Sequence, residues 1–172
     1  LYEGIELENE TVGLITYMRT DSIRLSNEFV SSVYKFIEAK YGKEYIGNVK
    51  VSKKVENVQD AHEGIRPTYS DIEPDSVKDE LSKDQYKLYK LIYNRFMASQ
   101  MKPAVYDTMS VNIKANDYDF KANGQNLKFK GFMILYVEGT DEKEEQEAGM
   151  LPELQEKQEV KLIKINPKQS FT

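Results

Sequence analysis

The chain has 172 residues, 40% hydrophobic and 31% charged, with no cysteine and one histidine. A chain of this length can bury about two thirds of its unfolded surface, which indicates a globular protein. The absence of cysteine excludes a disulfide framework and a thiolate metal site, and one histidine excludes a histidine-rich zinc site within the chain. No apolar run approaches the roughly 18 residues that a membrane-spanning helix needs, so we expect no membrane partner.

The net charge of −5 argues at first against a nucleic-acid partner, because phosphate contacts call for basic surface. The acidic residues, however, are concentrated. Residues 141–160 hold eight acidic and two basic side chains, a local balance of −6, so the rest of the chain carries +1. The charge pattern therefore leaves a nucleic-acid partner open.

The chain opens on Leu1, without an initiator methionine or a signal-like apolar core, so we expect a fragment of a longer protein. The first element predicted in chain order is an apolar strand that starts at Gly13 and ends at Tyr17. Because strand side chains alternate between faces, Tyr17 and Arg19 are expected to point the same way.

Two helices are predicted next. Apolar residues recur at helical spacing from Ser26, a candidate N-cap, to Tyr41, and Gly42 is a suitable C-terminal residue. Residues 43–60 read as a polar, locally basic loop. After a short helical candidate at residues 75–81, Ser82 and Gln85 make a capping box for a long helix to about Met101, expected at the centre of the core.

The character changes after Pro103. Residues 104–114, 118–122 and 126–137 read as strands, Asn123-Gly124 reads as a hairpin turn, and residues 159–165 read as a last strand after an acidic loop. We therefore expect an α+β protein with a boundary near Lys102. Residues 1–102 would form a mainly helical domain that carries the candidate site, and residues 103–172 would form a β-rich unit.

Tyr17 and Arg19 form the first candidate site. A free tyrosine has a pKa near 10, so a phenol that acts as a nucleophile needs activation. Arg19 can stabilise the phenolate and hold a phosphodiester by charge-assisted hydrogen bonds, which favours attack of Tyr17 on phosphorus. The structural alternative is a half-buried core tyrosine, since the chain has 12 of them. Asp21 would orient Arg19 or cap the turn.

The second candidate site lies in residues 61–68, which read Ala-His-Glu-Gly-Ile-Arg-Pro-Thr. If residues 61–66 form a helical turn, His62 and Arg66 share one face and make a phosphate grip, and Pro67 ends the turn. The structural alternative is a surface ion pair between His62 and Glu63 or another acidic residue. His62 and Glu63 lack the second histidine that a zinc-protease motif contains, so metal-dependent hydrolysis is a poor alternative.

Residues 17–22, which read Tyr-Met-Arg-Thr-Asp-Ser, resemble the active-site signature of bacterial DNA topoisomerase I, in the type IA topoisomerase family. Residues 61–68 resemble the next strong motif of that family, in the same order. Met18 fits topoisomerase I better than topoisomerase III, which usually has proline there. The resemblance covers essentially the whole chain and implies an active-site tyrosine domain followed by part of a β-rich arch domain.

The resemblance implies an ATP-independent isomerase that relaxes negatively supercoiled DNA. Tyr17 would be the nucleophile that forms a 5′-phosphotyrosyl link to single-stranded DNA, with strand passage and religation afterwards. Arg19 would be catalytic and would also bind DNA with His62 and Arg66.

In this family Mg²⁺ is bound by an upstream acidic domain, so we expect no metal site in this chain and no activity from the chain alone. The implied partners are single-stranded DNA and the remaining domains of the full-length protein, which would be cytoplasmic. Exposed β edges could also pair two copies of the fragment.

Other functions stay open from the residues alone. Helices and a sheet with scattered aromatic side chains fit a noncatalytic module that binds single-stranded nucleic acid. Residues 141–160 fit an acidic protein-interaction domain. A tyrosine recombinase would place several arginines and histidines before the tyrosine, and none precede Tyr17.

Overall fold

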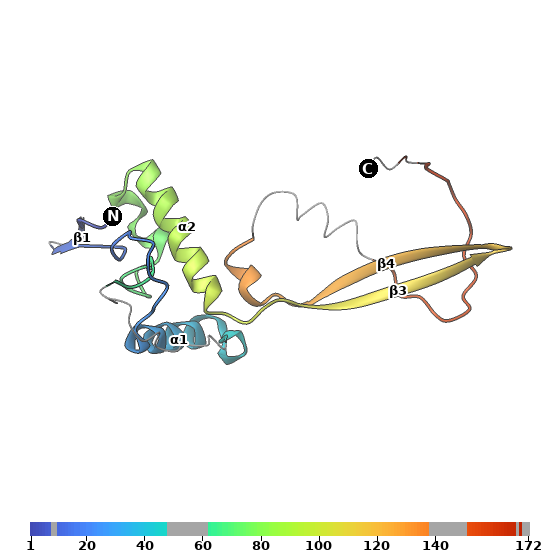
Figure 1. The fold of residues 1–172 in the computed structure, drawn as a ribbon, viewed down its shortest axis with the longest axis horizontal. Coiled ribbons are helices and arrows are strands. Elements are labelled where there is room, and N and C mark those ends of the chain that lie inside the picture. The colour runs from blue at the N-terminus through green and yellow to red at the C-terminus, as the bar shows by residue number, and fades with distance from the viewer. Residues whose placement is uncertain (8–9, 48–61, 138–150, 168, 170–172) are drawn as a thin grey trace.

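The computed structural model describes residues 1–7, 10–47, 62–137, 151–167 and 169. Most of the predicted loop at 43–60, and residues 141–150 of the acidic stretch, lie outside this part of the chain. The helical elements gather at one end of the molecule, and a long β-hairpin extends away from them (Figure 1). In chain order the elements are β1 (Ile5–Leu7), β2 (Glu10–Val12), α1 (Asn27–Tyr41), η1 (Lys43–Tyr45), η2 (Pro74–Glu80), α2 (Lys83–Ser99), β3 (Val105–Ala115), β4 (Tyr118–Phe129) and η3 (Gly131–Ile134).

Helix α1 begins and ends where its sequence predicts. The Ser26 hydroxyl accepts a hydrogen bond from the Phe29 amide at 3.2 Å, which satisfies one of the free amides of the first turn. Gly42 ends the helix with a φ of 107°, a conformation that favours glycine. The buried face carries Val33 and Ile37, both with no exposed surface.

Helix α2 has the predicted capping box. The Ser82 hydroxyl accepts from the Gln85 amide at 3.2 Å, and the Ser82 amide donates to the Gln85 side chain at 2.9 Å. The helix ends at Ser99 rather than Met101, because Met101 pairs with Ile46 in an isolated antiparallel bridge.

One hydrophobic core joins the two helices to the segment before Tyr17. Its buried members come from the N-terminal segments, α1, η2, α2 and Met101, and α2 contributes most of the largest ones, as predicted for the central helix. Leu14 is 1% exposed and Ile15 is 7% exposed, so the residues just ahead of Tyr17 are fixed by the core. The buried cluster consists of Ile5, Leu14, Ile15, Val33, Ile37, Val77, Tyr89, Tyr93, Phe96, Met97 and Met101.

Strands β3 and β4 form one long antiparallel hairpin with a register irregularity between Val105 and Tyr106, and its turn is not where the sequence predicts it. The turn is formed by Asn116 and Asp117, and Asn116 takes the left-handed φ of 53°. Asn123 and Gly124 lie inside β4, paired with Ser110 and Met109, so the predicted turn there is wrong. The predicted strands at 118–122 and 126–137 are therefore a single strand that ends at Phe129.

The residues after β4 leave the hairpin. Gly131 has a φ of 50°, and a Cβ there would lie 2.4 Å from the Lys102 carbonyl oxygen, so the chain turns against the end of α2 and continues as η3.

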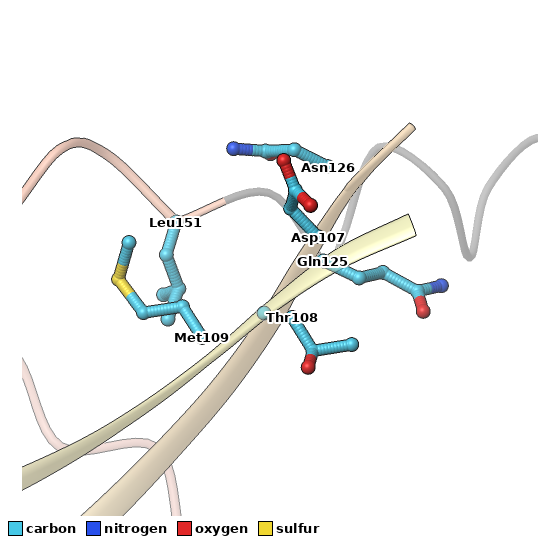
Figure 2. Close-up of a pocket in the computed structure, with 7 residues that line it drawn as sticks. Asp107, Thr108, Met109, Gln125, Asn126 and Leu151 are labelled. Carbon is cyan, nitrogen blue, oxygen red and sulfur yellow. The ribbon is translucent and has the colours of Figure 1, made fainter. Parts of the chain in front are cut away.

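Leu151 packs near Met109 on the hairpin, at the edge of a small pocket (Figure 2). The strand predicted at 159–165 is wrong: residues 151–167 contain no strand, and Ile163 is 95% exposed. An alternating pattern needs a neighbouring strand for its backbone hydrogen bonds, and no described strand pairs with this segment.

The α+β class predicted from the sequence is confirmed by these elements. The division near Lys102 stays a prediction. Within the described residues, no helix is long and apolar enough to cross a membrane.

Candidate functional site

The two sequence motifs are joined by a short backbone ladder, although they lie about 50 residues apart. Ile15 and Pro67 form an isolated antiparallel bridge. The Thr16 amide donates to the Arg66 carbonyl at 3.0 Å, and the Thr68 amide donates to the Leu14 carbonyl at 3.0 Å. The predicted strand is thus reduced to one bridge, and residues 62–66 are not helical, so the predicted helical turn is wrong.

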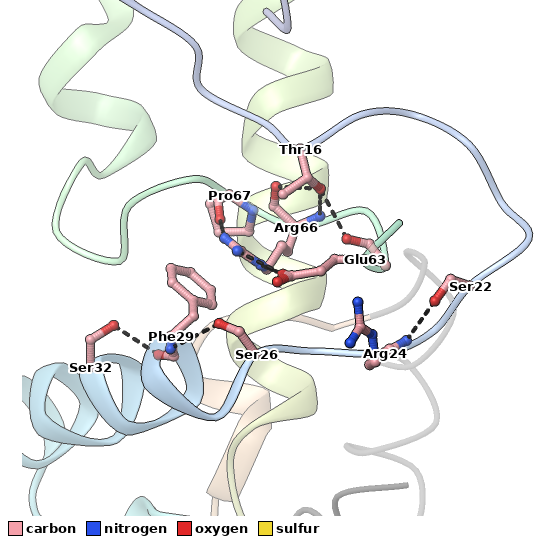
Figure 3. A network of polar contacts seen from close by, with 10 residues as sticks. Thr16, Ser22, Arg24, Ser26, Phe29, Ser32, Glu63, Arg66 and Pro67 are labelled. Atoms are coloured by element: carbon pink, nitrogen blue, oxygen red, sulfur yellow. Dashed lines mark hydrogen bonds and ion pairs between the residues drawn. The ribbon is translucent and has the colours of Figure 1, made fainter. Parts of the chain in front are cut away.

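Thr16 also joins the motifs through its side chain. Its hydroxyl donates to the Gly64 carbonyl at 2.9 Å and accepts from the Arg66 amide at 3.0 Å (Figure 3). These bonds satisfy two backbone groups of the second motif. Through its backbone and its side chain, Thr16 therefore holds the second motif next to Tyr17.

Tyr17 lies half-exposed between two other rings. Its exposed fraction is 45%, its ring centroid is 5.4 Å from that of Tyr2, and it is also 5.4 Å from that of His62. Interplanar angles of 54° and 37° are the tilted geometries that aromatic pairs adopt. Among the described residues, the Tyr17 hydroxyl has no hydrogen-bond partner, and it is open to a ligand.

Asp21 connects Arg19 to His62. One carboxylate oxygen is 2.7 Å from the Arg19 Nε, and the other is 3.8 Å from the His62 Nδ1. The Arg19 side chain is 59% exposed, so this pair leaves much of the side chain accessible to an anion. The structure therefore links Tyr17 to Arg19 indirectly: Tyr17 contacts His62, and Asp21 lies between His62 and Arg19.

Arg66 is the predicted site residue that lies apart from these side chains. Its side chain is 11% exposed, and its Nε and Nη2 atoms are both 2.7 Å from one Glu63 carboxylate oxygen. Nη1 donates to the Pro67 carbonyl at 2.9 Å, and the guanidinium lies 3.8 Å from the centroid of the Phe29 ring (Figure 3). These contacts favour a structural role over the predicted phosphate contact.

Helices α1 and α2 contact the second motif and the residues that follow it. The Phe29 ring of α1 contacts the Arg66 guanidinium. It also packs against Phe96 of α2, with ring centroids 5.6 Å apart. The hydroxyls of Tyr93 and Tyr89 on α2 donate to the carbonyls of Ser70 and Ile72, each at 2.6 Å.

Burial raises the pKa of Tyr89 and of Tyr93, which keeps both phenols neutral donors. The chain that leaves the second motif is thus anchored at two points on the core.

The acidic side chains near Tyr17 do not make a metal site. Asp21 and Glu63 are paired with arginines, and no group of three or more potential ligands that could hold a metal ion occurs within the described ranges. Asp21 and Glu63, each already paired with an arginine, offer too few oxygen ligands to hold a Mg²⁺ ion by themselves.

The model of a protein family described as DNA topoisomerase matches residues 1–172. The chain belongs to the DNA topoisomerase family. Full-length topoisomerase I from Thermotoga maritima is a similar solved structure, with a TM-score of 0.65 and 36% sequence identity over 78% of this chain. The match covers 21% of that chain, so the present sequence spans about a fifth of its length. The predicted resemblance to a bacterial type IA topoisomerase is confirmed.

Three features of this topoisomerase site were missed from sequence. Tyr2 lies outside both motifs, and only the structure shows that its ring contacts the ring of Tyr17. Thr16 lies just before the first motif, and the sequence does not show its partners, which are 48 and 50 residues away. Phe29 falls on the apolar spacing of α1, and its contact with Arg66 is seen only in the folded structure. The sequence signal for Thr16 is its place directly before the motif.

Proposed function

We propose that the full-length protein is a type IA topoisomerase that relaxes negatively supercoiled DNA, with Tyr17 as the nucleophile. The observation that carries the proposal is the half-exposed Tyr17 phenol, held between the rings of Tyr2 and His62 within the motif that indicates this family; Asp21 lies between His62 and the exposed Arg19. The proposed substrate is single-stranded DNA.

The proposed reaction exchanges one ester for another. The Tyr17 Oη atom attacks a backbone phosphorus, the new Oη–P bond forms, and the bond from phosphorus to the 3′ oxygen breaks. The phenol loses its proton and the departing 3′ oxygen gains one, which leaves a 5′-phosphotyrosyl link and a free 3′ hydroxyl. Religation after strand passage reverses these steps. Because the ester energy is conserved, no nucleotide cofactor is needed.

Arg19 and His62 are the proposed phosphate-binding residues. A guanidinium offers several N–H donors, and 59% exposure lets Arg19 reach a phosphate while Asp21 fixes its Nε edge. His62 packs against the Tyr17 ring and can donate a hydrogen bond to a neighbouring phosphate. We propose that Arg66 acts by holding this second motif in place, and the prediction that it binds DNA stays to be tested.

A labelled oligonucleotide tests the proposed linkage. The full-length protein is mixed with single-stranded DNA labelled at the 3′ end or at the 5′ end, denatured, and run on a gel. A 5′-phosphotyrosyl link transfers only the 3′-end label to protein, and the 5′-end label appears in a shorter free strand. Transfer of the 5′-end label, or an adduct that peptide mapping places away from Tyr17, contradicts the proposal.

The 172-residue chain alone is expected not to relax supercoiled DNA. We propose that Mg²⁺ is supplied by other parts of the full-length protein together with groups that move protons, since no group of three or more potential metal ligands occurs among the described residues. A plasmid relaxation assay with the purified chain and Mg²⁺ checks this, with the full-length protein as positive control. Mg²⁺-dependent relaxation by the chain alone would refute it.

Arg66 and Arg19 are expected to respond differently to substitution by glutamine. Arg66→Gln should lower the free energy of unfolding by about 1–3 kcal/mol, because Glu63 loses its partner at a poorly exposed position. Arg19→Gln, the matched control, removes an exposed pair and should change stability by less than about 1 kcal/mol. Urea denaturation of the chain measures both. Unchanged stability of Arg66→Gln with weakened DNA binding by the full-length protein would instead support the predicted DNA contact.

We propose a cytoplasmic location for the full-length protein, where bacterial chromosomal DNA lies. Within the described residues the β3–β4 sheet has only two strands, so both of its edges lack a third strand and could pair with a second copy or with the rest of the protein.

A further inference from the structure

The N-terminal hairpin of the chain ends beside the proposed nucleophile. Strands β1 and β2 pair from Ile5 opposite Val12 to Leu7 opposite Glu10, and the chain before β1 continues alongside the chain after β2. Tyr2 lies on this continuation. Its ring contacts the ring of Tyr17 at a centroid distance of 5.4 Å.

The backbone of Tyr2 is fixed on both sides. The Leu14 amide donates to the Leu1 carbonyl at 2.8 Å, and Gly13 approaches so closely that a Cβ there would lie 2.9 Å from the Tyr2 carbonyl oxygen. Ile5, three residues on, is 8% exposed in the core. The segment that contains Tyr2 is therefore held in place by backbone contacts and is not a free N-terminal tail.

The ring of Tyr17 depends on its neighbours for orientation. With 45% of its surface exposed and no hydrogen bond to its hydroxyl from the described residues, packing alone restricts its rotamers. His62 contacts it as well, at 5.4 Å, and is itself placed by the second motif. Tyr2 and His62 are the two ring contacts that hold it.

We propose that Tyr2 is a positioning residue that holds the Tyr17 ring in the orientation from which its hydroxyl reaches phosphorus. The inference rests on the proposed function of Tyr17 and adds a residue outside both motifs. A nucleophile that samples several rotamers spends less time at the reactive distance, so loss of the Tyr2 ring slows cleavage without weakening DNA binding. The Tyr2 hydroxyl has no part in this role.

The test compares Tyr2→Ala, Tyr2→Phe and the control Tyr118→Ala in the full-length protein. Tyr118 is a 72% exposed tyrosine at the start of β4. Two quantities are measured: the single-turnover rate of cleavage at saturating single-stranded DNA, and the dissociation constant for the same DNA. Tyr2→Ala should cleave about threefold to tenfold more slowly, as expected for the loss of one aromatic pair, with an unchanged dissociation constant. Tyr2→Phe should cleave at the parent rate, because the ring is kept, and so should Tyr118→Ala.

Each other outcome overturns the inference. A parent rate for Tyr2→Ala shows that the ring is not needed, a weaker dissociation constant with a parent rate makes Tyr2 a base-stacking residue, and a slow Tyr2→Phe assigns the effect to the hydroxyl. Tyr17→Phe, measured in parallel, separates the two proposals. If that variant still cleaves, the proposed function fails, whereas a dead Tyr17→Phe with a parent-like Tyr2→Ala removes only the role of Tyr2.

Discussion

Replacing Tyr17 by phenylalanine in the full-length protein is expected to abolish strand cleavage and relaxation, by on the order of a thousandfold or more. The substitution removes one oxygen, which is the atom that forms the ester with phosphorus. No described residue bonds to that hydroxyl, and the phenylalanine ring keeps the packing between Tyr2 and His62. The variant should therefore fold as the parent does, with a change in stability within about 0.5 kcal/mol.

Three measurements on Tyr17→Phe decide between the candidate functions: plasmid relaxation, covalent label transfer, and binding of single-stranded DNA. We expect the first two to be lost and the third to be kept, since Arg19 and His62 are untouched. Tyr69→Phe is the matched control, because Tyr69 is also about half exposed, at 49%, and is expected to behave as the parent. Full relaxation by Tyr17→Phe would favour the noncatalytic nucleic-acid module.

Local features of this chain were predictable from sequence because their causes are local. Ser26 and the Ser82–Gln85 pair cap helices through contacts three residues apart, so the sequence alone contains both partners. Gly42 ends α1 by its own backbone freedom. The helix boundaries predicted from these residues agree with the structure to within two residues.

The hairpin shows where local signals compete. Asn123-Gly124 is a stronger turn signal than Asn116-Asp117, yet the chain turns at Asn116-Asp117. Turning at Asn116 lets β3 and β4 pair over their full lengths, from Ala115 opposite Tyr118 to Val105 opposite Phe129. The hydrogen bonds of the long ladder thus override the turn preference of two residues.

At the site, the residue types were predictable and their arrangement was only partly so. Tyr17 contacts His62, and Asp21 lies between His62 and Arg19, although the expected strand and helical turn are absent. Arg66 was placed beside His62 on a helical spacing of four residues, but the bridge at Pro67 keeps the segment extended. Its guanidinium is then engaged by Glu63 and the Phe29 ring. The bridge between Ile15 and Pro67 and the contact between Arg66 and Phe29 join residues far apart in the chain, and periodicity does not show them.

The stability of the chain is expected to fall steeply above about pH 10, because α2 buries two neutral tyrosines. Tyr89 has no exposed surface and Tyr93 is 3% exposed, and burial raises the pKa of each above its ordinary value of 10. The nearby carboxylates of Asp71 and Glu73 act in the same direction. Both phenols therefore stay protonated in the folded chain at a pH where they ionise in the unfolded chain.

The direction of the pH effect follows from this difference in pKa. Below about pH 10 both states hold the two protons and the full stability is present. As the pH rises above 10, the unfolded state releases protons that the folded state keeps, so unfolding becomes easier. Each tyrosine contributes at most about 1.4 kcal/mol per pH unit to this loss. The effect continues until the pH reaches the raised pKa values of the folded state.

The double variant Tyr89→Phe/Tyr93→Phe tests the origin of this loss. It lacks the hydroxyls that bond to Ile72 and Ser70, so at pH 8 it should be less stable than the parent by about 1–3 kcal/mol. Because phenylalanine does not ionise, its free energy of unfolding should fall less steeply than that of the parent between pH 10 and 12. Urea denaturation followed by circular dichroism at each pH gives both slopes. Equal slopes would show that the buried phenols are not the source of the alkaline sensitivity. A flatter slope for the double variant would show that ionisation of these two tyrosines of α2, whose hydroxyls bond the segment after His62, causes the loss of stability.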